Sequence, residues 1–397
     1  MKLANRMSRL GTETAFEVLA RAKKLEAEGR DIIHLQIGEP DFDTPKNIVA
    51  AGAQALNDGY THYGPSPGMP DVRARIAKEI EMTRHIDVSP ENVVVTPGGK
   101  PIMFFTMLSL INEGDEVLYP NPGFPIYESM INYVGGVPVP MQLHESKEFS
   151  IDVEEIESKI TSKTKLMILN SPNNPCGSII TKNDLEKLAE LSIKHDIYVM
   201  SDEIYIRFLY EGKHESITQF QGMVDRTIIL DGFSKTYAMT GWRIGFCVAH
   251  SELIRKMAQF QSHQTGNPTS ISQKAALAAL ESPPDLVMEM KEEYRKRREI
   301  VLDYLPKIPG FSCPPPDGAF YAFPNVSECM KSMGINTSQE FATLLIEEAR
   351  VATVPGSAFG MEGYIRLSYA TSAENLKEGF SRIREAVTNR LGRGVAT

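Results

Sequence analysis

Residues 231–246 read DGFSKTYAMTGWRIGF, and this stretch decides the fold and the chemistry that the sequence predicts. It begins directly after the apolar run TIIL at 227–230, which is typical of a buried strand. Lys235 therefore lies on a short turn after that strand, and Arg243 follows eight residues later. A lone ammonium costs free energy to desolvate, and burial favours the neutral, nucleophilic form of a lysine. A surface lysine beside a loop is the plainer interpretation, so the neighbouring residues must decide.

Composition limits the classes of function. The chain has 397 residues, of which 42% are hydrophobic and 23% are charged, as in globular proteins with an ample core. The length predicts two or three domains, or one large domain with a satellite. The formal net charge of −9 argues against nonspecific binding to nucleic acid and to anionic membranes.

The cysteines, histidines and apolar runs bear on the cellular location of the protein and on metal binding. Four cysteines occur without a CxxC pair, at 176, 247, 313 and 329, and we interpret them as reduced thiols. The first residues show no secretory signal pattern, and no apolar run reaches the ~18 residues of a membrane span. We therefore expect a cytoplasmic protein. The eight histidines show no HExxH spacing, so we predict no metal site.

From about 44 to 283, helical patterns alternate with short apolar runs. The predicted helices are 47–58, 70–83, 101–111, 125–133 and 181–194. The predicted strands are 93–95, 116–119, 166–169, 197–200, 227–230 and 244–248. Such alternation predicts an α/β fold, with a mostly parallel sheet covered by helices on both faces.

Both ends of the chain show a different pattern. A strand at 32–37 precedes the alternating region, and a charged helix at 285–305 follows it. Strands at 318–323 and 364–369 and helices at 338–349 and 373–391 complete the chain. We therefore predict a large α/β domain at 44–283 and a smaller α+β domain built from 1–43 and 284–397.

Polar residues follow the predicted strands. Gly98, Gly99 and Lys100 open a helix after 93–95, and free amides at a helix start bind anions. The turn at 170–177 presents amide side chains such as Asn174, and Asp202 and Tyr205 follow 197–200. Each of these is a plain turn or helix start when taken alone. The carboxyl ends of parallel strands meet at one edge of a sheet, so we expect these groups to converge with Lys235 and Arg243. Pyridoxal phosphate needs this set: a phosphate cradle, a carboxylate, hydroxyl and amide donors, and an amine.

Six motifs in order carry a resemblance to a known family. They are GEPDFDTP (38–45), YTHYGPSPGMPDVR (60–73), SPNNPCG (171–177), SDEIY (201–205), SKTYAMTGWRIGF (234–246) and YIRLSYA (364–370). Together they resemble the class I/II aminotransferases of the aspartate aminotransferase superfamily, which are pyridoxal-phosphate enzymes of fold type I. The resemblance runs from about Thr14 to Arg390. It implies a seven-stranded, mostly parallel sheet beside a smaller α+β domain.

The resemblance implies cofactor roles for matching residues. Lys235 would form the Schiff base with pyridoxal phosphate and shuttle protons, and Asp202 would partner the ring nitrogen. Tyr205 and Asn174 would bind the ring oxygen. The remaining implied cofactor contacts are the Gly99 and Lys100 amides, Ser234, Arg243, Phe124 stacked on the ring, and Tyr63 from a neighbouring subunit.

The implied substrate contacts are Arg366, Gly38 and Asn174. Arg366 would grip the α-carboxylate as a bidentate pair, and the Gly38 amide would touch the same carboxylate. The position of Tyr63 implies a homodimer with shared active sites. Two departures stand out. Gly232 occupies a position where many relatives have a phosphate-binding serine, and Lys100 occupies a position often taken by a small hydroxyl or amide residue.

The predicted function is the transfer of an amino group from an L-amino acid to a 2-oxo acid. Rival hypotheses are a C–S lyase or another pyridoxal-phosphate reaction on this fold, and a non-catalytic regulator. The substrate side chain stays open. We expect its pocket to involve residues 14–16, the Gly38 loop, Phe124 and the Tyr63 region of the partner. No obvious arginine marks a second carboxylate, so we expect an aliphatic or aromatic donor, with 2-oxoglutarate or pyruvate as the acceptor.

Overall fold

Seven strands form the main sheet, in the spatial order β2-β8-β7-β6-β5-β3-β4. The strands are β2 (Val93–Thr96), β3 (Glu116–Asn121), β4 (Val137–Gln142), β5 (Thr164–Asn170), β6 (Tyr198–Asp202), β7 (Thr227–Gly232) and β8 (Gly245–Val248). β8 runs antiparallel to its neighbours β2 and β7, and the other pairs are parallel. The computed structural model describes residues 1–11 and 14–394. It confirms the predicted α/β fold with a mostly parallel sheet.

Helices cover both faces of this sheet. They are α2 (Lys46–Asn57), α3 (Pro70–Arg84), α4 (Lys100–Leu110), α5 (Ile126–Val134), α6 (Val153–Lys159), α7 (Lys182–Lys194), α8 (Ser251–Gln264) and α9 (Ser270–Glu281). Alternate residues of one strand face opposite layers: Leu166 and Ile168 pack with α4, α5 and α8, whereas Met167 and Leu169 pack with α6 and α7. The near-continuous apolar run of β5 follows from burial on both faces.

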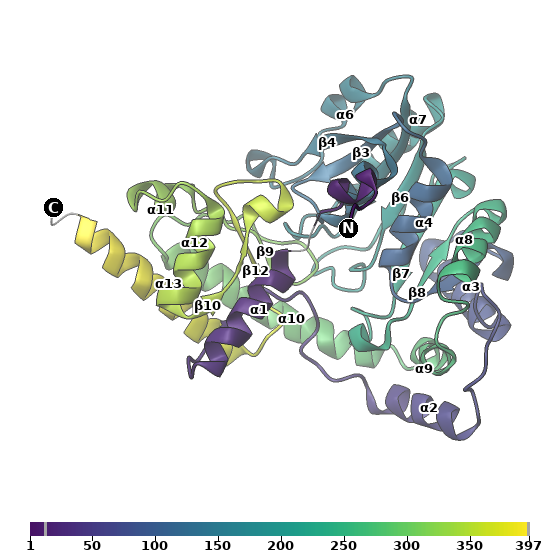
Figure 1. Ribbon diagram of the computed structural model, residues 1–397, viewed down its shortest axis with the longest axis horizontal. Coiled ribbons are helices and arrows are strands. Elements are labelled where there is room, and N and C mark those ends of the chain that lie inside the picture. The colour runs from purple at the N-terminus through teal and green to yellow at the C-terminus, as the bar shows by residue number, and fades with distance from the viewer. Residues whose placement is uncertain (12–13, 395–397) are drawn as a thin grey trace.

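The remaining elements form a second lobe beside the sheet (Figure 1). They are α1 (Thr14–Ala27), β1 (Ile33–His34), α10 (Asp285–Tyr304), β9 (Tyr321–Ala322), α11 (Ser327–Ser332), α12 (Ser338–Leu344), β10 (Val351–Ala352), β11 (Val354–Pro355), β12 (Ile365–Ser368) and α13 (Ala373–Gly394). β1 pairs in parallel with β10, and β11, β12 and β9 form an antiparallel sheet. Residues 33–34 and 351–352 therefore lie side by side although they come from opposite parts of the chain, while the domain boundaries near 44 and 283 stay a prediction. Within residues 1–11 and 14–394, no helix combines the length and apolar character of a bilayer span.

The structure differs from the sequence prediction in several elements. The strand expected at 32–37 is reduced to β1, and that expected at 318–323 is reduced to β9. The elements that were not predicted are β4, α6, α8, α9, α11, β10 and β11. Pro138 and Pro140 argue against a strand at β4 in the sequence, because proline lacks the amide donor that a central strand needs. β4 tolerates both prolines because it lies at the edge of the sheet, paired with β3 alone.

Candidate active site

Three neighbouring strands end in the polar residues that the sequence singled out. Asn170 at the end of β5 lies opposite Asp202 at the end of β6, and Asp202 lies opposite Leu230 of β7. The Asn170 Nδ2 donates to the Asp202 carbonyl oxygen at 3.2 Å. Lys235 follows the end of β7 by three residues. The expected gathering of polar groups at the carboxyl edge of the sheet is therefore present.

Lys235 is partly buried between the two lobes. Its Nζ donates to the Gly38 carbonyl oxygen and lies 5.9 Å from the centroid of the Phe320 ring. A Cβ added at Gly38 would lie 2.0 Å from the Tyr321 hydroxyl oxygen. Glycine is thus required for the 38–45 loop to approach this closely.

The surroundings of Lys235 favour its neutral amine. Burial lowers the pKa of Lys235 to about 8, and the positive charges of Arg366, Arg243 and Lys100 act in the same direction against Glu39. An ordinary lysine has a pKa near 10.4. A substantial fraction of Lys235 is therefore neutral, and so nucleophilic, at physiological pH.

Asp202 is a buried carboxylate held through both oxygens. The Tyr127 hydroxyl donates to its Oδ2 at 2.6 Å, and the Ile204 amide donates to its Oδ1 at 3.3 Å. Burial raises the pKa of Asp202 to about 6, with the charges of Asp231 and Glu203 adding to the effect. A cationic ring nitrogen is the kind of partner that offsets the cost of burying this charge.

Two tyrosine hydroxyls meet beside Lys235. The hydroxyls of Tyr205 and Tyr321 are 2.8 Å apart, and the Tyr321 hydroxyl also reaches the Gly38 carbonyl oxygen at 3.4 Å. Burial raises the pKa of Tyr205 well above its ordinary value. Tyr205 is therefore a neutral phenol, able to donate a hydrogen bond to a ring oxygen.

Arg366 is fixed in place from several sides. Its Nη2 donates to the Gln36 carbonyl oxygen at 2.7 Å, and its Nη1 donates to the Asn174 Oδ1 at 3.0 Å. The guanidinium carbon lies 4.6 Å from the Tyr321 ring centroid and 4.9 Å from that of Phe359. A guanidinium oriented in this way is suited to bind a carboxylate.

The start of α4 forms an anion cradle. Gly98 has a φ of 86°, and Gly99 is the N-cap of α4. A Cβ at Gly98 would lie 2.3 Å from the Arg243 Nη2, so the arginine packs directly on the glycine backbone. Helix amides next to a guanidinium match a phosphate. The first residue of α4, Lys100, places its ammonium 5.5 Å from the Phe16 ring centroid.

The other predicted residues lie as follows. Phe124 precedes α5, and its ring meets that of Tyr127 edge-on at 5.8 Å. Ser234 is buried beside Lys235. Tyr63 instead lies on the surface, 94% exposed, and lines an open pocket of about 380 Å³ together with Asn267.

Four residues of this site were not predicted from the sequence: Tyr127, Tyr321, Gln36 and Phe359. Tyr321 lies in a predicted strand, but the sequence alone gives no sign that its ring lies under Arg366. Tyr127 reads as an ordinary member of an apolar helix. Contacts between residues far apart in the sequence, such as Tyr127 with Asp202, have no local pattern.

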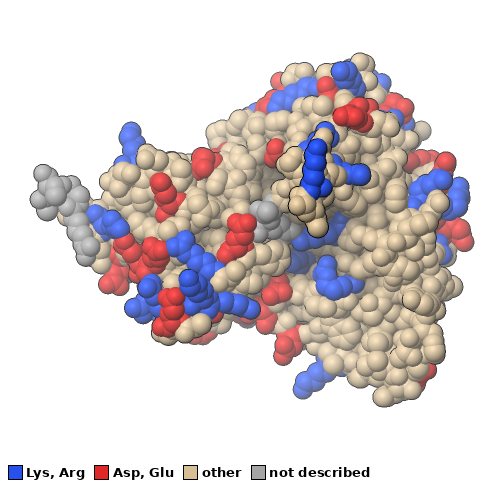
Figure 2. Space-filling model, in the orientation of Figure 1, with Lys and Arg blue, Asp and Glu red and all other residues tan. Residues whose placement is uncertain are grey.

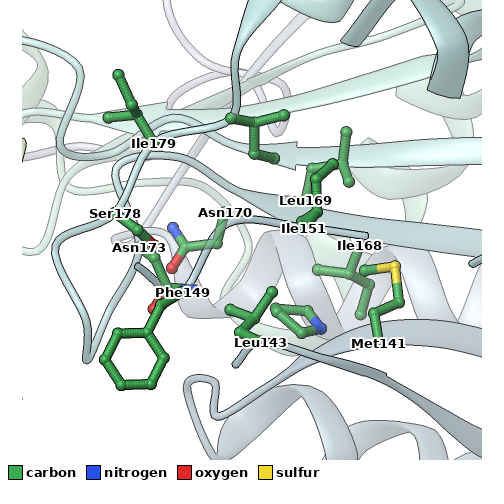
Figure 3. A pocket seen from close by; sticks show the side chains of 12 residues that line it. Met141, Leu143, Phe149, Ile151, Ile168, Leu169, Asn170, Asn173, Ser178 and Ile179 are labelled. Atoms are coloured by element: carbon green, nitrogen blue, oxygen red, sulfur yellow. The ribbon is translucent and has the colours of Figure 1, made fainter. Parts of the chain in front are cut away.

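Figure 2 shows Lys and Arg side chains gathered in the hollow between the two lobes. A separate cavity behind the 170–177 turn is lined mainly by apolar side chains, among them Met141, Leu143 and Ile168 (Figure 3). It leaves about 10 Å³ for the centre of a water molecule. That space admits about one water and no amino acid.

Comparisons with known proteins agree with this geometry. Residues 30–383 match the family model "Aminotransferase class I and II". The chain is 41% identical over 389 residues to an aspartate aminotransferase of Bacillus subtilis, covering 98% of this chain and 99% of the relative. It is 39% identical to aromatic-amino-acid aminotransferase 2 of Thermococcus litoralis, covering 98% of each. The structure of an aspartate aminotransferase from Thermus thermophilus with maleate superposes with a TM-score of 0.93 at 37% identity, covering 97% of this chain and 100% of that one.

The residues present fit the cofactor of this family, pyridoxal phosphate. A glycine cradle with an arginine is available for the phosphate, a buried carboxylate for the ring nitrogen, and a partly neutral lysine for the aldehyde. The family model and the aspartate aminotransferase match nearly the whole chain, which identifies the protein as a transaminase. The chain belongs to the class I and II aminotransferases, the pyridoxal-phosphate enzymes that move an amino group from an amino acid to a 2-oxo acid.

Proposed function

We propose that Lys235 is the Schiff-base lysine and the general base of this aminotransferase. The observation that carries the proposal is its amine: burial lowers the pKa of Lys235 to about 8, at the place where the carboxylate, the tyrosine pair and Arg366 meet. A base acts best when its pKa lies near the working pH. Lys235 would remove the proton from the Cα of the bound amino acid and carry it on Nζ.

The cofactor would be held by residues from five segments of the chain. Bound pyridoxal phosphate supplies an aldehyde that condenses with amines and a ring that accepts electron density. Asp202 would bind the ring nitrogen and keep it protonated, while Tyr205 and Asn174 would donate to the ring oxygen. Phe124 would cover the ring. The proposed phosphate contacts are Arg243, Ser234 and the amides of Gly99 and Lys100.

Arg366 would bind the α-carboxylate of the substrate, with the Gly38 loop on the other side. Its two outer nitrogens are already oriented by Gln36 and Asn174. Fixing the carboxylate fixes the direction of the Cα–H bond relative to the Lys235 amine. This positioning selects proton removal over cleavage of another bond at Cα. Transamination and C–S lyase chemistry both begin with that proton removal, so the products must distinguish these two reactions.

We propose a dicarboxylic substrate pair, aspartate with 2-oxoglutarate. Relatives at 40–43% identity are named aspartate aminotransferases, and the Thermus structure holds the dicarboxylate maleate. In this chain, Lys100 is close enough for its charge to act on Lys235, so it offers a cation for a second carboxylate. An aromatic donor is the second candidate, because one relative is named an aromatic-amino-acid aminotransferase.

We also propose a homodimer in which Tyr63 reaches the phosphate of the partner's site. The exposure of Tyr63 supports this, since a 94% exposed tyrosine ring is available for contact with a second copy. A cytoplasmic location is supported by the four free thiols, which a reducing compartment maintains. We further propose two domains: a large domain at 44–283 and a small domain formed by 1–43 and 284–397.

Single half-reactions test the function. Purified holoenzyme is mixed with aspartate, glutamate, phenylalanine, asparagine or cysteine, and loss of the cofactor's visible absorbance is followed by stopped flow. We expect aspartate and glutamate to react fastest and to yield stoichiometric 2-oxo acid without ammonia. Ammonia and pyruvate from cysteine in the absence of an acceptor would instead identify a lyase. Lys235→Ala is the reference, and wild-type turnover by that variant would refute the assignment of Lys235.

A further inference from the structure

Tyr127 is a fully buried tyrosine with its hydroxyl on the carboxylate of Asp202. The hydroxyl oxygen lies 2.6 Å from the Asp202 Oδ2, and Tyr127 and Asp202 are 0% and 4% exposed. We propose that Tyr127 is a positioning residue that fixes the Asp202 carboxylate against the cofactor's ring nitrogen. This inference rests on the role proposed above for Asp202.

The direction of this hydrogen bond is fixed by chemistry. Burial raises the pKa of Tyr127 well above its ordinary value, with the charge of Asp202 adding to the effect. Tyr127 is therefore a phenol that donates at every physiological pH, and the carboxylate accepts. The bond favours the ionised form of Asp202, which is the form that pairs with a protonated ring nitrogen.

The hydrogen bonds of the Asp202 carboxylate show that the Tyr127 hydroxyl fixes its orientation. Tyr127 engages Oδ2 from α5, while the Ile204 amide engages Oδ1 at 3.3 Å from the segment after β6. An ionised carboxylate has about four acceptor positions, so both oxygens keep capacity for another donor. Two donors on different oxygens prevent rotation of the group, and its free acceptor positions therefore keep one direction.

Tyr127 also links two cofactor contacts mechanically. It lies in the first turn of α5, three residues after Phe124, and the two rings meet edge-on at 5.8 Å. The ring of Tyr127 packs in the core between α4, α5, α8 and the sheet, so the position of the hydroxyl is set by the core. One helix start thus holds both the ring proposed to cover the cofactor and the hydroxyl that orients Asp202.

The other charged groups near Asp202 are already engaged elsewhere. Glu203 and Asp231 both receive hydrogen bonds from the buried guanidinium of Arg84, at 2.9 and 2.5 Å. Ser216 also donates to Glu203, and His214 lies 3.3 Å from it. Among these neighbours, Tyr127 is the side chain that hydrogen-bonds the Asp202 carboxylate itself.

The test compares Tyr127→Phe with two reference variants. Tyr127→Phe removes the hydroxyl and keeps the ring. Tyr119→Phe is the matched control, because Tyr119 is a buried tyrosine of the same core whose hydroxyl pairs with Glu128. Asp202→Asn removes the charge itself. The readouts are thermal unfolding, the dissociation constant of pyridoxal phosphate from each apo-protein, and the pH midpoint of the visible absorbance of each holoenzyme.

We expect Tyr127→Phe to bind pyridoxal phosphate tenfold to a hundredfold more weakly, because the Asp202 carboxylate loses the donor that orients it. We also expect its absorbance midpoint to shift upward by about one pH unit, toward that of Asp202→Asn. A ring nitrogen with a less firmly held partner withdraws less electron density, so the lysine–cofactor linkage becomes more basic. Tyr119→Phe should match the wild type in both.

The outcomes distinguish the role inferred for Tyr127 from the role proposed for Asp202. If Tyr127→Phe melts earlier but binds the cofactor and titrates like the wild type, the hydroxyl is structural and the inference is wrong. If Asp202→Asn is also unchanged, the role proposed for Asp202 fails first. Equal effects of Tyr127→Phe and Tyr119→Phe would assign the change to general loosening of the core and would likewise overturn the inference.

Discussion

At the scale of single residues, the environment of Lys235 changes what a lysine does. Burial is the main cause that lowers the pKa of Lys235, and the positive charges of Arg366, Arg243 and Lys100 add to it. The neutral amine therefore becomes available at a pH where exposed lysines remain fully charged. This property can be measured on the apo-protein, before any turnover.

We predict that the rate of pyridoxal-phosphate capture by the apo-protein rises with pH, with a midpoint near 8, and levels off at about 9. The pKa of Lys235 is lowered to about 8, so the neutral fraction is nearly complete about one unit above that value. The rate is followed by absorbance from pH 6 to 10. Nα-acetyl-lysine, titrated under the same conditions, corrects for protonation of the cofactor. A protein curve that keeps rising in parallel with Nα-acetyl-lysine beyond pH 9 would contradict the lowered pKa.

A second residue prediction concerns Arg366. Arg366→Lys keeps the positive charge but loses the planar fork that Gln36 and Asn174 hold. We expect KM for both the amino acid and the 2-oxo acid to increase tenfold to a hundredfold, because one charged hydrogen bond is lost. Affinity for pyridoxal phosphate should change little. Arg382→Lys, at a surface pair with Asp31, is the control, and an unchanged KM in Arg366→Lys would remove Arg366 from the substrate site.

At the scale of elements, α3 is connected to the catalytic edge of the sheet by one ion-pair cluster. Arg84, the last residue of α3, bonds Glu203 after β6 and Asp231 in β7, and all three side chains are less than 10% exposed. These acids flank Asp202 and the turn that leads to Lys235. The cluster therefore fixes two adjacent strand ends relative to each other.

We predict that Arg84→Met lowers the free energy of unfolding by about 3–5 kcal/mol, because it leaves two buried carboxylates without their cation. Thermal and denaturant unfolding of the holoenzyme measure the effect. Arg382→Met removes an exposed pair with Asp31 and should cost about 1 kcal/mol or less. Similar losses in the two variants would show that the buried cluster is not a special source of stability.

The elements that the sequence predicted are those whose burial leaves a local pattern. Strands β5, β6 and β7 are covered on both faces, and their apolar runs make them visible. β4 escaped because an edge strand accepts prolines that a central strand excludes. β1 and β9 were predicted too long, since each keeps regular strand pairing over only two residues. Leu35, next to β1, still hydrogen-bonds through its backbone to Ala352 and Ser368.

The residues of the candidate site likewise fall into those that a local sequence pattern predicted and those that it did not. Asp202 ends β6, and Lys235 and Asn174 lie in the turns that follow β7 and β5, so the topology of a parallel sheet brings them together. Tyr127 comes from a helix and Gln36 from the other lobe, and their contacts with Asp202 and Arg366 depend on tertiary packing. Sequence order contains no record of that packing. The residues missed are thus those that orient the proposed catalytic groups.

At the scale of the whole molecule, the proposed dimer makes a prediction about shared sites. We expect Tyr63→Phe to weaken pyridoxal-phosphate binding, and we expect Lys235→Ala to be inactive. When the two variants are co-expressed with different tags, each mixed dimer should contain one complete site, formed by Lys235 of one protomer and Tyr63 of the other. Tandem purification and cofactor titration measure the recovered site. Dimers in which no tight site returns would place Tyr63 outside the shared site.

The bond between Arg366 and Gln36 joins residues 330 positions apart. On a ribosome, Gln36 and Lys235 emerge while the segment bearing Arg366 has yet to be made. A nascent chain can assemble the parallel sheet and expose the lysine, but Arg366, the proposed carboxylate binder, must wait for the last tenth of synthesis. Pyridoxal phosphate can thus meet a partly made protein, whereas an amino acid finds its full binding site only after translation is nearly complete.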